Sequence, residues 1–183
     1  RAMLQIVHDV APGAELYFRS GFHTGGDMAR GIRELRDAGC KVIVDDITYS
    51  TEPFLKDGIL ARTVDEVKSV AGGGVTYFSS AGNFGNKSYE ANFNRYTFGG
   101  RTVHNFGTSA APDPFEKIKL APGDYVFVFQ WLDNIYSLSE TAGTQVDLDI
   151  FLTRTEDGAG LIGFNRDNLI GDPIEFIPIT IPP

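Results

Sequence analysis

The 183 residues suffice for one large domain or two small ones, and 42% apolar, 12% aromatic and 22% charged residues are the balance of an ordinary globular protein. The net charge of −8 argues against nucleic acid as the main partner, and no apolar run reaches the ~18 residues of a membrane helix. Acidic residues are unevenly distributed along the chain, since residues 100–183 contain twelve acidic and only five basic residues. We therefore expect two modules with neither a nucleic-acid nor a membrane partner.

The first half has the alternation of helix and strand that is typical of α/β proteins. Its apolar residues recur at helical spacing or in short runs, and glycines or prolines end each run. The expected elements are a helix over 2–10, a strand over 16–18, a helix from Asp27 that ends just before Gly39, a strand over 42–44, a helix that opens near Asp57 and stops at Gly72–Gly74, and a strand over 75–78. This order predicts a parallel sheet with right-handed crossovers, which binds its ligand beyond the carboxyl ends of its strands. The loops expected there are 20–26, 45–54 and 79–85.

The second half alternates apolar and polar residues with the period of two that is typical of β-strands. The runs are Tyr125–Trp131, Val146–Thr153 and Ile174–Ile181, the last with a proline that confines it to a sheet edge. Several such runs separated by turn signals predict a small β-sandwich or jelly roll. The predicted division is an α/β module over residues 1–98 and a β-sandwich over residues 99–183.

Metal ligands are sparse in this sequence. Asp147 and Asp149 share one face of their predicted strand, and with Asp133 they could offer oxygens to Ca²⁺. The simpler interpretation is that they form the solvated side of an alternating strand. The histidines are not paired at i, i+4 spacing and have no cysteine partners, which argues against zinc. We expect no cofactor, with calcium the one ion left open.

The glycine-rich loop 21–26 follows a predicted strand and precedes a helix, which is the order that a phosphate-binding loop requires. It lacks both G-x-G-x-x-G and the P-loop lysine, and Gly72–Gly74 stands on the wrong side of its strand. A small-molecule binding protein that uses loop 21–26 stays an alternative.

The most informative motif is Ala81-Gly82-Asn83-Phe84-Gly85, which directly follows a predicted buried strand. Small residues let a ligand approach the backbone, and the Asn83 amide can donate a hydrogen bond to an oxygen. With this motif, four stretches of the first half resemble, in the same order, segments of the subtilisin-like serine proteases, the subtilases. They are Ala2–Ala14 with its V-A-P-G-A end, Leu16–Arg19, Gly31–Val44 and Val75–Gly85.

Residues 115–182 do not match a subtilase core and are similar to an inserted β-sandwich of the pre-peptidase C-terminal type. The resemblance implies the α/β fold class for the first module, as a subtilisin-like parallel sheet fragment with crossover helices. It implies an all-β sandwich or jelly roll for the second module. It implies a secreted or cell-surface serine endopeptidase that acts on a peptide or protein substrate.

The resemblance also implies residue roles. Asn83 matches the asparagine of the oxyanion hole, which donates to the carbonyl oxygen as it becomes negative. The residues that would line the substrate cleft are Gly25, Gly26, Asp46, Ile47, Thr48, Ala81 and Gly82. Asp45-Asp46 departs from the uncharged residues usual in the family, so it would either favour basic substrates or impair binding. Ser79-Ser80 is a milder departure.

The catalytic Asp, the general base, which is His in subtilases and Glu in the related sedolisins, and the catalytic Ser are not assigned to any residue of this sequence. Gly107-Thr108-Ser109-Ala110-Ala111-Pro112 is close to the family's G-T-S-x-A-x-P, but its proline comes one residue early and a β-pattern follows. Ser109 is therefore interpreted as a linker serine, and the triad is expected upstream and downstream of these residues. The chain alone is then an inactive fragment that needs the remaining subtilase segments and is prone to self-association. The alternative is a non-catalytic module whose β-sandwich docks glycan or protein.

Overall fold

The computed structural model describes residues 2–140, 142–164 and 166–183. Contacts within the chain separate two compact units, Arg1–Gly82 and Asn83–Pro183. The boundary at residue 98, which rests on composition and resemblance, stays a prediction.

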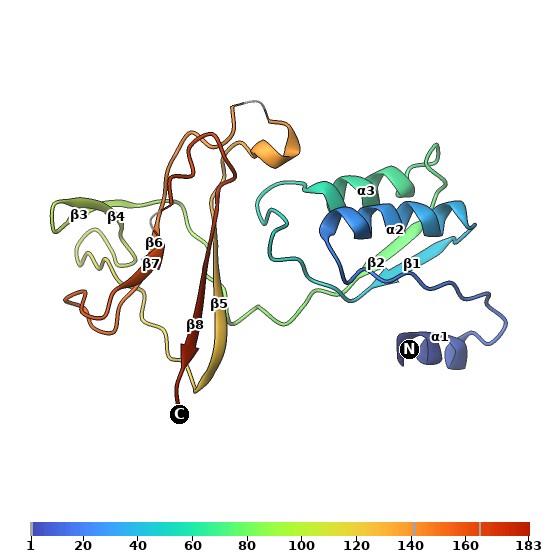
Figure 1. Ribbon diagram of the computed structural model, residues 1–183, viewed down its shortest axis with the longest axis horizontal. Helices are drawn as coiled ribbons and strands as arrows, with labels where there is room; N and C mark the ends of the chain where they lie inside the picture. The colour runs from blue at the N-terminus through green and yellow to red at the C-terminus, as the bar shows by residue number, and fades with distance from the viewer. Residues whose placement is uncertain (1, 141, 165) are drawn as a thin grey trace. The chain divides into compact units, whose positions relative to one another are not determined.

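In unit 1, Arg1–Gly82, the described residues from 2 onward form a pair of parallel strands and three helices. Its elements are α1 (Ala2–Val10), α2 (Gly25–Asp37), β1 (Val42–Asp45), α3 (Ile59–Lys68) and β2 (Thr76–Ser79). β1 pairs with β2 in parallel, with Val42 opposite Thr76 and Asp45 opposite Ser79. Helices α2 and α3 pack side by side and cover one face of this pair (Figure 1).

The ends of α2 and α3 are set by local hydrogen bonds. The Thr24 hydroxyl accepts from the Asp27 N–H at 3.1 Å and caps α2, and Gly39 just beyond its end has a φ of +97°. Gly58 has no side chain with which to cap α3, so the Glu52 carboxylate accepts from the Leu60 N–H at 3.1 Å instead. Both helices thus begin where a polar oxygen satisfies an otherwise unpaired N–H.

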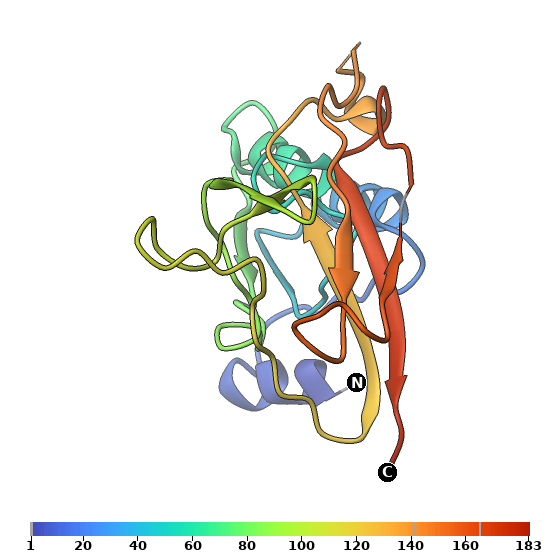
Figure 2. The same cartoon turned by 90° about the vertical axis from the view of Figure 1, so that its left-hand side faces the viewer.

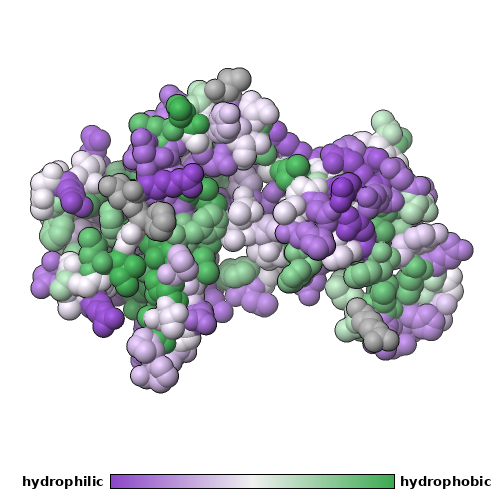
Figure 3. Space-filling view, viewed as in Figure 1, coloured by the Kyte–Doolittle hydropathy of each residue, from purple (hydrophilic) through white to green (hydrophobic). Residues whose placement is uncertain are grey.

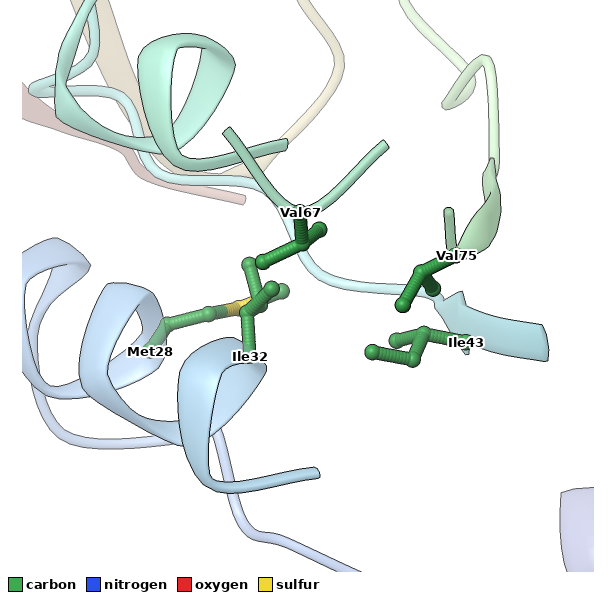
Figure 4. Packing of buried hydrophobic residues seen from close by; sticks show 5 residues of the cluster. All are labelled: Met28, Ile32, Ile43, Val67 and Val75. Atoms are coloured by element: carbon green, nitrogen blue, oxygen red, sulfur yellow. The ribbon is translucent and has the colours of Figure 1, made fainter. Parts of the chain in front are cut away.

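The hydrophobic core of unit 1 lies between the two helices and the strands. Figure 4 shows its buried side chains, which are Met28 and Ile32 of α2, Val67 of α3, Ile43 of β1 and Val75 just before β2. The opposite face of the strand pair is exposed, with Val42, Val44 and Phe78 about half accessible to solvent. The core is therefore one-sided.

Unit 2, Asn83–Pro183, is built from antiparallel pairs. Its elements are β3 (Arg95–Phe98), β4 (Arg101–His104), β5 (Gly123–Gln130), the 3-10 helix η1 (Tyr136–Leu138), β6 (Ile150–Leu152), β7 (Ile162–Phe164) and β8 (Ile174–Ile181). The pairs are β3–β4, β5–β8 and β6–β7. β5 and β8 form a long ribbon in which Gly123 lies opposite Ile181 and Gln130 opposite Ile174 (Figure 2).

Polar groups hold much of unit 2 together. The Trp131 indole N–H donates to the Thr144 hydroxyl oxygen at 3.2 Å, and the Thr144 hydroxyl donates to Asp133 at 2.7 Å. Thr144 is fully buried, so this network fixes the segment after β5. Hydrophobic side chains also gather on the surface over β5, β6 and β7 (Figure 3), with Val126, Phe151 and Ile162 exposed.

The predicted fold class, a parallel sheet with crossovers joined to a β-sandwich, is wrong. The described residues form four separate two-stranded sheets, and only β1–β2 is parallel. The apolar run Leu16–Phe18 is exposed and lies outside any strand, since no neighbouring strand pairs with it. The run expected over Val146–Thr153 is a strand only at Ile150–Leu152, and the Asp147 carboxylate just before it binds a loop N–H instead. An apolar pattern makes a segment fit for a strand, but a sheet forms only where a partner strand is available.

Candidate functional site at the carboxyl ends of the parallel strands

The candidate site lies at the edge of unit 1 where β1 and β2 end. Because the strands are parallel and Asp45 lies opposite Ser79, residues 46–48 and 80–82 leave the pair at the same edge. Loops at the carboxyl ends of parallel strands are where α/β proteins place their ligands. Asp46, Ile47 and Thr48 are all exposed there.

The Asp45 carboxylate ties the two strand ends together. The Tyr77 hydroxyl donates to one carboxylate oxygen at 2.5 Å, and the Ser79 hydroxyl donates to the other at 2.9 Å. The Ser80 N–H continues the ladder by donating to the Asp45 carbonyl oxygen at 3.3 Å. Burial and then the hydrogen bond to Asp45 raise the pKa of Tyr77, so the phenol stays protonated and remains a donor. Asp45 is thus a structural acid whose oxygens are already engaged.

The loop before α2 packs against the loop after β1. Gly21 is buried, and a Cβ there would lie 2.8 Å from the Ile47 Cδ1. Gly25 lies beside the Glu52 carboxylate, since a Cβ added at Gly25 would be 3.2 Å from Glu52 Oε1. A Cβ added at Gly26 would have Thr24 Oγ1 as its nearest neighbour, at 3.9 Å, so there is space for a side chain at that position. Gly25 and Ile47 therefore belong to one assembly of loops.

Charged groups beside this assembly are paired. The Arg19 guanidinium donates to Asp27 at 2.9 Å and to Glu34 at 2.7 Å. The hydrogen bond from Arg19 to Asp27, followed by that from Arg30, holds the pKa of Asp27 below its usual value although burial opposes the shift. The Tyr49 hydroxyl is buried without a hydrogen-bond partner among the described residues. Burial, followed by the charges of Asp27 and Asp45, raises the pKa of Tyr49.

Asn83 follows Gly82 directly and is the first residue of unit 2. Gly82 has a φ of +72°, a left-handed conformation that glycine adopts without steric cost. The turn residues Ala81, Gly82 and Asn83 are all exposed. The role of Asn83 as an oxyanion donor stays a prediction, as do the substrate-binding roles of the residues around it.

Ser109 lies in an exposed turn of unit 2. The Thr108 N–H donates to the Ala111 carbonyl oxygen, and the Ala111 N–H donates to the Thr108 hydroxyl oxygen, each at 3.0 Å. Residues 106–122 form no helix, so Ser109 does not open the buried helix on which a subtilase places its serine. This geometry agrees with its interpretation as a linker residue.

The acidic residues of unit 2 have different roles. Asp133 accepts hydrogen bonds from the Thr144 hydroxyl and from the backbone N–H groups of Asn134, Gln145 and Val146. Burial alone raises the pKa of Asp133, but these four donors outweigh it and the pKa lies below its usual value. Asp133 is therefore a structural group rather than a partner of Asp147 and Asp149. Within the described ranges, no three His, Cys, Asp or Glu side chains already converge on a metal position.

Three buried polar groups were not expected from the sequence: Tyr49, Asn168 and Glu175. Each has a buried oxygen without a hydrogen-bond partner in the part of the chain that the structure describes. The burial of Glu175 could have been predicted from the sequence, since strand alternation places Glu175 on the same face as Ile177. Both side chains are 2% exposed.

Comparison of the chain with models of protein families, with curated proteins and with solved structures finds no match in any of the three. None of the helices in the described residues is long and apolar enough to span a membrane.

Proposed function

We propose that this chain supplies part of a serine endopeptidase, with Asn83 as the oxyanion donor and residues 46–48 as a segment that pairs with an extended peptide. The observation that supports the proposal best is the parallel register of β1 and β2. It brings the Asp46–Thr48 segment and the Ala81–Gly82 turn that leads to Asn83 to one edge. The nucleophile and the general base would come from residues outside this sequence.

The chemistry requires a donor where negative charge develops. When a nucleophile attacks a peptide carbonyl, the oxygen becomes an oxyanion, and a fixed amide N–H stabilises it more than it stabilises the substrate. Asn83 carries such an N–H on an exposed turn, next to a glycine that leaves room for a substrate backbone. The amide has no titratable proton, so its donor function does not vary with pH near neutrality.

Charge at the edge suggests a substrate preference. The Asp45 oxygens are engaged by Tyr77 and Ser79, whereas Asp46 is exposed and is the first residue of the proposed peptide-pairing segment. An exposed carboxylate attracts a cationic side chain and disfavours an anionic one. We therefore expect substrates with Lys or Arg near the scissile bond.

The first experiment incubates the purified 183-residue chain with casein and with a fluorescent serine-directed phosphonate. We expect neither turnover nor labelling, since the assigned residues include no activated nucleophile. The Ser109→Ala variant is the matched control. Turnover, or labelling that this substitution abolishes, would overturn the assignment of Ser109 as a linker residue and of the chain as inactive alone.

The second experiment tests Asn83 in the protein expressed from its gene together with the flanking coding sequence. Asn83→Ala should lower kcat with little change in KM, by about 10²–10³-fold, the loss that subtilisin itself shows without its oxyanion asparagine. Asn86→Ala, at an exposed position in the same stretch, is the control and should leave kcat unchanged. Equal kcat values for both variants and the unmodified protein would refute the proposed role, as would an absence of peptidase activity.

A further inference from the structure

We propose that unit 2 carries a binding site for a divalent cation, Ca²⁺ above all, formed by the side-chain oxygens of Asp147, Asp149, Asn168 and Glu175. The site lies where the start of β6 meets the start of β8. It is independent of the proposed peptidase function.

The first ligand is Glu175 of β8. This side chain is only 2% exposed, and one carboxylate oxygen accepts from the Ile150 N–H at 2.9 Å. The other oxygen has no hydrogen-bond partner among the described residues. A buried carboxylate oxygen without a donor requires a proton or a cation to compensate for the loss of water. Because Ile150 directly follows Asp149, the unpaired oxygen belongs to the same small region as the acidic pair.

The second ligand is Asn168, which is 3% exposed. Its side-chain NH₂ donates to the carbonyl oxygens of Asp172 at 2.9 Å and Ile174 at 3.1 Å, so both amide protons are used. Its backbone N–H donates to an Asp147 carboxylate oxygen at 3.0 Å. Its side-chain oxygen has no partner within the described residues. Two buried acceptors without donors thus lie on segments that are tied to Asp147 and Ile150.

The carboxylates also repel one another. Burial and then the charge of Asp147 raise the pKa of Asp149. Burial raises the pKa of Glu175, the backbone N–H groups of Ile150 and Arg166 oppose this, and the charges of Asp149 and Asp147 raise it further. Arg101 offsets the charge at Asp149 in part. A bound cation would relieve this repulsion and satisfy the unpaired oxygens together.

The donor set selects the class of ion. Every ligand is a carboxylate or amide oxygen, the donors that hard cations prefer, and no nitrogen or sulfur donor is included. Ca²⁺ accepts six to eight oxygens in irregular geometry with waters completing the shell, whereas Mg²⁺ demands a near-ideal octahedron. No three acidic side chains of the described residues converge as they stand, so acidic side chains of the site have to move when the ion binds.

The experiment titrates the chelator-treated chain with CaCl₂ by calorimetry and follows thermal unfolding through Trp131, which lies in unit 2. We expect saturable binding of one ion and a higher Tm with Ca²⁺ than with EDTA. Asp149→Asn changes an exposed residue and should weaken binding at least tenfold without loss of fold. Glu116→Gln removes one exposed negative charge elsewhere in the unit and should leave binding unchanged.

Glu175→Gln separates a cation site from a simply protonated carboxyl group. Without calcium the variant should unfold at a higher temperature than the unmodified chain, because it removes a buried charge. With saturating calcium the order should reverse. The absence of a calcium-dependent heat or Tm shift, or unchanged affinity in Asp149→Asn, would overturn the proposal and leave Glu175 as a protonated core residue.

Discussion

The hydrogen bond between Tyr77 and Asp45 should contribute measurably to the stability of unit 1. Tyr77→Phe removes the hydroxyl that donates to the carboxylate at 2.5 Å but keeps the ring that packs against the core. A hydrogen bond to a charged group contributes about 1.5–3 kcal/mol. Since the Asp45 carboxylate keeps the Ser79 donor, we expect the lower part of that range, about 1.5 kcal/mol less free energy of unfolding.

The assay is urea unfolding followed by circular dichroism at 222 nm. All the α-helices that the structure describes lie in unit 1, so this signal reports mainly on that unit. A double-mutant cycle with Asp45→Ala, which removes both acceptor oxygens, should give a coupling energy of about 1 kcal/mol or more between the two side chains. Tyr17→Phe is the control for loss of a hydroxyl, since Tyr17 is 49% exposed, and should change the free energy of unfolding by less than about 0.5 kcal/mol. A coupling energy near zero would mean that the contact does not stabilise the strand ends.

Three further predictions concern stability. Because folding lowers the pKa of Asp133, the stabilisation that its carboxylate gives unit 2 is complete above the ordinary aspartate pKa of about 4 and is lost as the pH falls through the lowered pKa. Unfolding followed by Trp131 fluorescence should therefore show the unmodified chain losing stability on acidification more steeply than Asp133→Asn. Parallel profiles would contradict this. Gly72→Ala should lower the free energy of unfolding of unit 1 by about 2 kcal/mol or more in urea, because its Cβ would overlap the Glu66 carbonyl oxygen. Gly13→Ala, in the same unit and with open space around it, should have little effect; equal values would refute the steric argument. His104→Phe removes the ring nitrogen that accepts a hydrogen bond from the Asn94 N–H at 3.1 Å. It should lower the free energy of unfolding in urea by about 1 kcal/mol and speed hydrogen exchange of the Asn94 amide. Unchanged exchange would contradict this role of His104.

Much of the local structure was predictable from the sequence. Apolar residues at helical spacing correctly placed α2 and α3, and β5 and β8 follow the alternation of their runs. Gly39 has the left-handed φ expected just past a helix end. These features depend on residues close together along the chain, so a sequence pattern is enough to predict them.

The candidate site was predictable only in part. The sequence indicated loops 45–54 and 79–85, but the Tyr77–Asp45 contact depends on the register of two strands separated by a helix. Asp133, which the spacing left open as an oxygen donor to Ca²⁺, accepts hydrogen bonds from the following segment, while Asn168 and Glu175 keep unpaired oxygens. Hydrogen-bond saturation depends on which loops fold over a side chain, and spacing along the chain does not encode that.

By itself the sequence determined where most helices and strands form, the acidic character of the second half and the small-residue turn that leads to Asn83. Only the tertiary structure decided that the strands pair two by two and that one face of β1–β2 stays exposed. It also decided which carboxylates are buried. The physical reason is that helix and turn formation are governed by neighbours along the chain, whereas sheet pairing and burial require contacts between distant residues, whose free energy no local pattern contains.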